Sequence, residues 1–201
     1  MKKMVLFFLL MTSFCWGDDD IELLISSEEI SHKIAEVAAT INEEYRGEEL
    51  AIIMVMKGAI CVSVDLMRHL EIPFTVDYIK ASSYGQQGTQ RGELVLKGIE
   101  KIDLKDKHVL VVDDIFDSGH TMSTIVNSLQ KKQMKSLKTL VLLLKNVPRE
   151  ISYLPDYILF HIENRFVIGY GLDYKEFYRG LPGIYAFVND TPPASLDEKP
   201  N

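Results

Sequence analysis

Three aspartates follow one another closely at the end of an apolar run in the middle of the chain. Residues 108–121 read HVLVVDDIFDSGHT, so Asp113, Asp114 and Asp117 come directly after a segment with the composition of a buried strand. In a parallel sheet, ligands bind beyond the carboxyl ends of the strands, where these carboxylates would lie. Ribose hydroxyls and Mg²⁺ are suitable partners for such clustered acceptors. For the Asp113–Asp114 pair taken alone, a purely structural role as a cap is the alternative.

The turn after this strand has the composition of an anion-binding loop. Residues 117–121, DSGHT, lead into a helical pattern, and the free N–H groups and dipole of a helix N-terminus favour a phosphate. Ser118 and Thr121 add hydroxyl donors, and Gly119 permits close approach of a ligand. The chain contains no G-x-x-x-x-G-K-[ST] motif, which excludes a Walker-type ATPase. A carboxylate pair beside a phosphate site indicates a phosphorylated sugar as the ligand.

Alternating strand and helix patterns surround this segment. A capping box formed by Ser26 and Glu29 precedes apolar residues at helical spacing up to Gly47. Two further helices are expected to begin near residues 60 and 121, where apolar residues recur three or four positions apart. Strands are expected at residues 50–56, 73–79, 94–96, 108–112, 138–144 and 157–162. The alternation predicts an α/β fold with a central, mostly parallel sheet flanked by helices.

Two polar regions interrupt or follow this pattern. Residues 82–93, SSYGQQGTQRGE, contain three glycines and no aliphatic side chain, which predicts a mobile loop. Residues 189–201 are polar and contain three prolines, and we expect a disordered tail there. A single domain is therefore expected over residues 18–188.

The composition limits the class of protein. A chain of 201 residues with 47% apolar content can bury the core of one domain, and a formal net charge of −7 argues against general binding to nucleic acid or an anionic membrane. Cys15 and Cys61 lack the spacing of a zinc site or a disulfide scaffold. Residues 1–17 carry Lys2 and Lys3 before an apolar run too short to cross a bilayer. This leader is either a secretory signal or an upstream mis-start.

The segment VVDDIFDSGHT resembles the motif with which type I phosphoribosyltransferases bind 5-phosphoribosyl-1-diphosphate (PRPP). Four flanking segments are similar to those of the hypoxanthine-guanine phosphoribosyltransferases, namely MKGA (56–59), SSY (82–84), LLLKNVPR (142–149) and FVIGYGLDYKEFYR (166–179). The similarity covers roughly residues 20–188. It implies a central sheet with a small hood and a flexible lid loop, PRPP and a 6-oxopurine base as substrates, Mg²⁺ as cofactor, and a homodimer or homotetramer.

The resemblance implies a role for each residue of the aspartate cluster and its turn. Asp113 and Asp114 would hold the ribose hydroxyls and their Mg²⁺, although the first acid of this pair is commonly glutamate in the family. Asp117 would accept the purine proton. The 5′-phosphate would be bound by the residues of the turn, which are Ser118, Gly119, His120 and Thr121. His120 stands where lysine is frequent, so a plain surface role for it is the alternative.

Residues outside the motif would bind the diphosphate and the base. Lys57 and Gly58 match the family's diphosphate loop, in which the peptide bond before the lysine can be cis. Arg179, and with it Arg149, would supply further cations. Lys145 would donate a hydrogen bond to the 6-oxo group of the base, and such a buried donor rejects a 6-amino purine because its own hydrogen bond stays unmade.

The remaining implied residues complete the base pocket and its cover. Phe166 would stack on the purine, Val167 would offer backbone groups to its edge, and Asp173 would complete the pocket and bind a second Mg²⁺. By spacing alone, Phe166 and Val167 are core residues. The glycine-rich loop, with Ser83 and Tyr84, would close as a lid that keeps water from the reactive ribosyl centre.

These observations leave two other functions open. A PRPP-sensing regulator on the same fold would bind nucleic acid, but the net charge of −7 and the lack of a basic surface run argue against it. A xanthine-preferring transferase is separated poorly, because the 2-position of the base is read largely by backbone groups. The supply of PRPP in the cytosol favours a cytoplasmic protein over an exported one.

Overall fold

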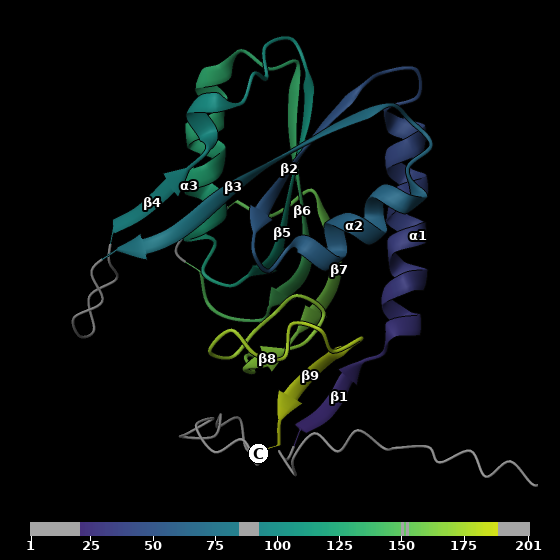
Figure 1. Cartoon of the computed structure of the whole chain (residues 1–201), viewed down its shortest axis with the longest axis vertical. Helices are drawn as coiled ribbons and strands as arrows, with labels where there is room; N and C mark the ends of the chain where they lie inside the picture. The colour runs from purple at the N-terminus through teal and green to yellow at the C-terminus, as the bar shows by residue number, and fades with distance from the viewer. Residues whose placement is uncertain (1–20, 85–92, 150, 152, 189–201) are drawn as a thin grey trace, which may run out of the picture.

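A six-stranded sheet forms the centre of the molecule (Figure 1). The computed structural model describes residues 21–84, 93–149, 151 and 153–188. The strands lie in the order β4-β3-β2-β5-β6-β7, and all are parallel except β4, which runs antiparallel to β3. Their bounds are Leu50–Met56 for β2, Phe74–Tyr84 for β3, Glu93–Lys97 for β4, His108–Phe116 for β5, Ser136–Lys145 for β6 and Tyr157–Ile162 for β7. The predicted mostly parallel sheet is confirmed.

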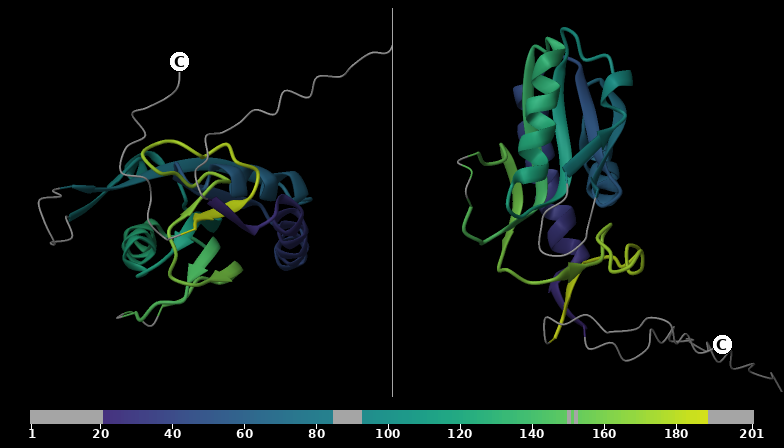
Figure 2. Two further views of the ribbon diagram at one scale, coloured as in Figure 1. Left: turned by 90° about the horizontal axis from the view of Figure 1, so that it is seen from below. Right: turned by 90° about the vertical axis from the view of Figure 1, so that its left-hand side faces the viewer.

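Helices cover both faces of this sheet. Helices α1 (Ser27–Glu44) and α2 (Ile60–His69) lie on one face, and α3 (His120–Leu129) lies on the other (Figures 1 and 2). Short 3₁₀ turns occupy Ile99–Lys101 and Gln130–Lys132. The predicted capping box starts α1, because Ser26 Oγ accepts from the backbone N–H of Glu29 while Glu29 Oε2 accepts from that of Ser26 at 2.8 Å.

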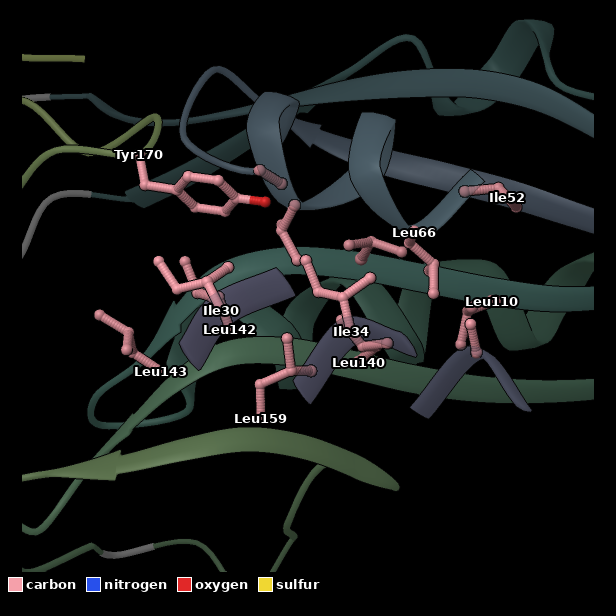
Figure 3. Packing of buried hydrophobic residues seen from close by; sticks show 14 of the residues in the cluster. Ile30, Ile34, Ile52, Leu66, Leu110, Leu140, Leu142, Leu143, Leu159 and Tyr170 are labelled. Atoms are coloured by element: carbon pink, nitrogen blue, oxygen red, sulfur yellow. The ribbon is translucent and has the colours of Figure 1, made fainter. Parts of the chain in front are cut away.

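The core consists of two layers of apolar side chains, one on each face of the sheet. On the α1 side, Ile30 and Ile34 pack with leucines of the central and edge strands, which include Leu140, Leu142 and Leu159 (Figure 3). Strand β6 is buried on both faces from Leu140 to Leu144, as expected of a central parallel strand. This packing fixes the carboxyl ends of β2 and β5, where the candidate site lies.

A second, three-stranded sheet lies beyond the carboxyl ends of the parallel strands (Figures 1 and 2). It consists of β1 (Ile21–Ile25), β9 (Ile184–Phe187) and β8 (Val167–Ile168), paired antiparallel in that order. It provides the small hood expected from the family resemblance. The pairing of the first described strand with the last was not predicted, because it joins residues more than 150 positions apart.

Strand lengths differ from the prediction around the glycine-rich loop. Residues 82–84 belong to β3 and residue 93 to β4, where backbone pairing between Lys80–Tyr84 and Glu93–Lys97 continues the sheet. The loop prediction was therefore too long at both ends, and residues 85–92 lie outside the described residues. The leader 1–17 and the tail 189–201 also lie outside them. Within the described part, no helix is long and apolar enough to cross a membrane.

Candidate active site

The turn between β2 and α2 approaches the aspartate cluster closely. It contains Lys57 and Gly58, and the Met56–Lys57 peptide bond is cis, as the family resemblance implied. A Cβ atom built on Gly58 would lie 1.6 Å from Oδ2 of Asp114 and 2.3 Å from its Cγ. Only glycine therefore fits against this carboxylate, which explains the residue type in the MKG segment.

Asp113 and Asp114 are the last polar residues of β5 before its end at Phe116. They were expected just after the strand, but β5 continues for four more residues because its pairing with β6 includes Asp113 opposite Val141. The backbone N–H of Asp114 donates to Asp113 Oδ1 at 2.9 Å. Burial, and then the adjacent Asp114 carboxylate, raise the pKa of Asp113 well above its usual range, and burial also raises the pKa of Asp114. A ligand that supplies positive charge or hydroxyl donors would therefore stabilise the ionised form of both carboxyl groups.

The turn after β5 leads into α3 as predicted. Gly119 adopts a left-handed conformation with φ of 79° and precedes His120, the first residue of the helix. A Cβ on Gly119 would lie 2.1 Å from Ile151 Cδ1, so the turn is also held by packing. The backbone N–H of His120 approaches Ser118 Oγ at 3.5 Å. The loop thus presents a helix N-terminus at the end of a buried strand.

Arg149 holds this turn in place through hydrogen bonds to backbone carbonyls. Its Nε donates to the backbone carbonyl of Asp117 at 3.0 Å, and its Nη2 donates to the carbonyl of Lys145. Its guanidinium also lies over the ring of Phe116. These contacts tie the end of β6 to the turn after β5, so in this conformation Arg149 contacts the turn and not the diphosphate loop.

The hood contributes one cation, Arg179, and two anions, Asp173 and Glu176, to the same region. Arg179 Nη2 lies 2.7 Å from Asp173 Oδ1 and 3.1 Å from Glu176 Oε2, while Nη1 donates to the carbonyl of Gly171 at 2.7 Å. Glu176 Oε2 also lies 2.7 Å from Lys57 Nζ. The two cations expected at the diphosphate are therefore joined through one glutamate.

A cavity of about 290 Å³ brings most of these groups together. Its polar lining comes from four separate segments and consists of Lys57, Gly58, Asp113, Asp114, Thr121, Asp173 and Arg179. Apolar walls come from Val55, Met56, Ala81, Leu94 and Ile115. Carboxylates, of which Asp113 is buried, and cationic side chains thus line a single cavity at the carboxyl edge of the sheet.

Of the residues expected at the base, Asp173 lines this cavity, whereas Lys145, Phe166 and Val167 do not. Lys145 ends β6, and Val167 begins β8 and is buried. Phe166 is 38% exposed and packs edge-on against Tyr174, with ring centroids 5.7 Å apart. Phe166 is therefore partly exposed although it belongs to an aromatic cluster of the hood. Ser83 and Tyr84 are the last two residues of β3. The rest of the expected lid, residues 85–92, lies outside the described residues.

Two contacts of the site were not predicted from the sequence. Glu176 reaches Lys57 across 119 positions, and Tyr170 Oη donates to Asp65 Oδ2 of α2 at 2.6 Å. The second contact fastens the hood to the helix behind the diphosphate loop. The only local signal for either was the position of both residues inside the 166–179 segment that carries the resemblance.

The fold and the site together are suited to a phosphorylated sugar as ligand. The doubly covered parallel sheet, the carboxylate pair in β5 and the adjoining turn at the start of α3 are the features that such a ligand requires. A sequence model of the phosphoribosyl transferase domain matches residues 25–175. The chain belongs to the phosphoribosyltransferase family.

Several similar proteins have names that specify the purine base they use. The chain is 38% identical over 167 residues to the hypoxanthine phosphoribosyltransferase of Salmonella typhimurium, covering 82% of this chain and 93% of that one. It is 39% identical over 169 residues to the hypoxanthine-guanine-xanthine phosphoribosyltransferase of Tritrichomonas foetus, covering 83% and 91%. A crystal structure of a hypoxanthine-guanine phosphoribosyltransferase from Bacillus anthracis superposes with a TM-score of 0.78 at 37% identity, covering 83% and 98%.

Proposed function

We propose that the protein transfers the 5-phosphoribosyl group from PRPP to N9 of hypoxanthine, guanine or both, giving IMP or GMP and diphosphate. The proposal makes it a purine-salvage enzyme. The single observation that carries it is the cavity in which the carboxylates of Asp113 and Asp114 adjoin Lys57 and Arg179. The relatives named as hypoxanthine phosphoribosyltransferases support the choice of base.

The phosphoribosyl group is bound between the strand end and the turn. Asp113 and Asp114 accept hydrogen bonds from the ribose hydroxyls. The 5′-phosphate takes the backbone N–H groups at the start of α3 together with the residues of the loop, which are Ser118, Gly119, His120 and Thr121. The start of α3 at His120, directly after the turn, supports this assignment, because the free N–H groups of a helix N-terminus favour an anion.

The donor set fits Mg²⁺ carried by the substrate. Among the described residues, no group of three or more His, Cys, Asp or Glu side chains forms a ready metal cluster. Mg²⁺ in phosphate-transfer sites commonly takes only one or two carboxylates and fills its other positions with water and substrate oxygens. This matches the pair Asp113 and Asp114, with Asp173 lining the same cavity. When bound, the ion supplies Lewis-acid neutralisation of the leaving diphosphate.

The protein's own residues bind and orient the two reactants. Lys57, Gly58 and Arg179 bind the diphosphate, so that the C1–O bond breaks toward a cationic environment. Asp117 accepts the proton released from the purine as N9 bonds to C1, a contribution of about 10² to 10⁴-fold. Ser83 and Tyr84 belong to a lid that excludes water from C1.

The base is recognised by its 6-oxo group and its flat face. Lys145 donates to the 6-oxo oxygen, Phe166 stacks on the ring and Val167 offers backbone groups to its edge. The partial exposure of the Phe166 ring supports the stacking role. Adenine carries a 6-amino donor that leaves Lys145 unpaired, and sites of this kind discriminate by up to about 10⁴-fold.

We further propose that two or four copies associate in the cytoplasm, where PRPP is made. An exposed apolar surface supports self-association: the alternate residues Phe74, Val76 and Tyr78 of β3 are exposed, as are Ile60 and Val64 of α2. Sedimentation velocity should therefore give a mass that is a multiple of 22.9 kDa.

A substrate panel tests the proposed reaction. The protein is incubated with PRPP and Mg²⁺ and with hypoxanthine, guanine, xanthine or adenine, and nucleotide and diphosphate are measured. We expect turnover of hypoxanthine or guanine, and none of adenine. Xanthine is included because the Tritrichomonas foetus relative is named for hypoxanthine, guanine and xanthine. PRPP binding without turnover of any base would favour a PRPP-sensing regulator instead, and a gel shift in low salt would then test nucleic-acid binding.

A further inference from the structure

Glu176 forms ion pairs with both of the cationic side chains that would bind diphosphate in the proposed reaction. Its Oε2 lies 2.7 Å from Lys57 Nζ and 3.1 Å from Arg179 Nη2. Lys57 belongs to the turn after β2 and Arg179 to the hood, so one carboxylate bridges two segments. Arg179 Nε is buried without a hydrogen-bond partner among the described residues, which leaves this cation only partly satisfied.

The backbone places this glutamate in an unusual conformation. Lys175 and Glu176 have φ of 50° and 71°, although neither is glycine. They are the two central residues of a tight turn in which the backbone N–H groups of Tyr174 and Phe177 each donate to the other's carbonyl. The N–H of Glu176 also donates to Asp173 Oδ2 at 2.8 Å. Left-handed backbone in a non-glycine residue carries strain, and such strain concentrates at functional sites.

The bridge is suited to exchange with a ligand. The Glu176 side chain is 64% exposed and that of Lys57 is 52% exposed, and solvent-exposed ion pairs contribute little to stability. The hydrogen bonds from Lys57 and then Arg179 lower the pKa of Glu176, so it is anionic at neutral pH. Incoming diphosphate needs the same donors, and it can take them without disturbing the core.

We propose that Glu176 is a positioning residue that acts as an internal, displaceable anion: it holds Lys57 and Arg179 together before substrate binds and weakens diphosphate binding by competing for them. The inference rests on the proposed function, since it takes the diphosphate group as the ligand. In the reaction it keeps the two cations ordered for PRPP and assists release of the diphosphate product.

Calorimetric titration with inorganic diphosphate at fixed MgCl₂ tests this inference. Glu176→Gln removes the charge with little change of shape, and we expect its Kd for diphosphate to fall about twofold to fivefold, a size typical of losing an exposed ion-pair competitor. Glu176→Asp keeps the charge and should stay closer to wild type. The matched control is Glu36→Gln, because Glu36 forms a 2.9 Å ion pair with Lys33 on the outer surface of α1 and carries the same charge change.

The outcomes separate this inference from the proposed function. Wild type that binds diphosphate with a Kd equal to or lower than that of Glu176→Gln overturns the role of Glu176 and leaves the reaction standing. Failure of every variant, wild type included, to bind diphosphate overturns both. As a second readout, the Ki of diphosphate against PRPP should fall in Glu176→Gln, whereas the KM for hypoxanthine should not change.

Discussion

Replacing Gly58 by alanine should inactivate the site without unfolding the protein. The new Cβ would lie 1.6 Å from Asp114 Oδ2, and real Cβ contacts below 3.0 Å are essentially never found, so the two groups must separate from 1.6 Å to at least 3.0 Å. Asp114 Oδ1 accepts a hydrogen bond from the backbone N–H of Ile115 at 2.9 Å, which holds this side chain in place, and therefore the loop or the carboxylate moves by more than 1 Å. A misplacement of about 1 Å costs roughly 10²-fold in rate.

Steady-state formation of IMP measures this loss, with PRPP affinity and thermal unfolding followed in parallel. We expect kcat/KM for PRPP in Gly58→Ala to fall at least about 10²-fold. Gly180→Ala is the matched control, because a Cβ at Gly180 meets nothing within 4 Å although it adjoins Arg179. Activity of Gly58→Ala within about threefold of Gly180→Ala would refute the close packing of the diphosphate loop against Asp114.

Two further predictions concern the supports of the site. Tyr170→Phe removes the hydrogen bond to Asp65 and should lower stability by about 1 to 2 kcal/mol, read by thermal unfolding, and raise the KM for PRPP more than it lowers kcat. Burial raises the folded-state pKa of Asp113 above its ordinary value of 3.8, so stability should decline as pH rises from about 4 through that raised pKa. Asp113→Asn should reduce this decline, with Asp114 still contributing to it, and should melt at a higher temperature than wild type at pH 8 while losing PRPP turnover. Equal melting temperatures of the two proteins at pH 8 would contradict the argument that burial of the ionised Asp113 carboxylate destabilises the folded protein.

The parts of the fold that local sequence determines could be predicted from it. The apolar run of β5, the turn after it and the capping box of α1 each depend on neighbouring residues, and each is found where the patterns indicated. The end of β5 at Phe116 was missed because two aspartates look like a strand end, whereas pairing with β6 continues through Asp113. The carboxylates are tolerated inside the strand because they face the cavity.

The contacts between distant segments could not be read from residue patterns. The hood pairs Ile21 with Phe187, and Glu176 reaches Lys57 only because a left-handed turn directs it there. No periodicity or propensity encodes either contact. The site residues were assigned through the family resemblance. The cavity supports the diphosphate and ribose assignments by bringing those residues together, while the assignments of Lys145, Phe166 and Val167 to the base stay predictions.

The proposed chemistry is tested most directly by Asp117→Asn. Mg²⁺-dependent conversion of hypoxanthine and PRPP to IMP is measured for both proteins, with PRPP binding measured by calorimetry. If Asp117 accepts the purine proton, kcat should fall by about 10² to 10⁴-fold while the Kd for PRPP changes little. Wild-type protein that forms no IMP, or a variant that retains full kcat, would contradict the account.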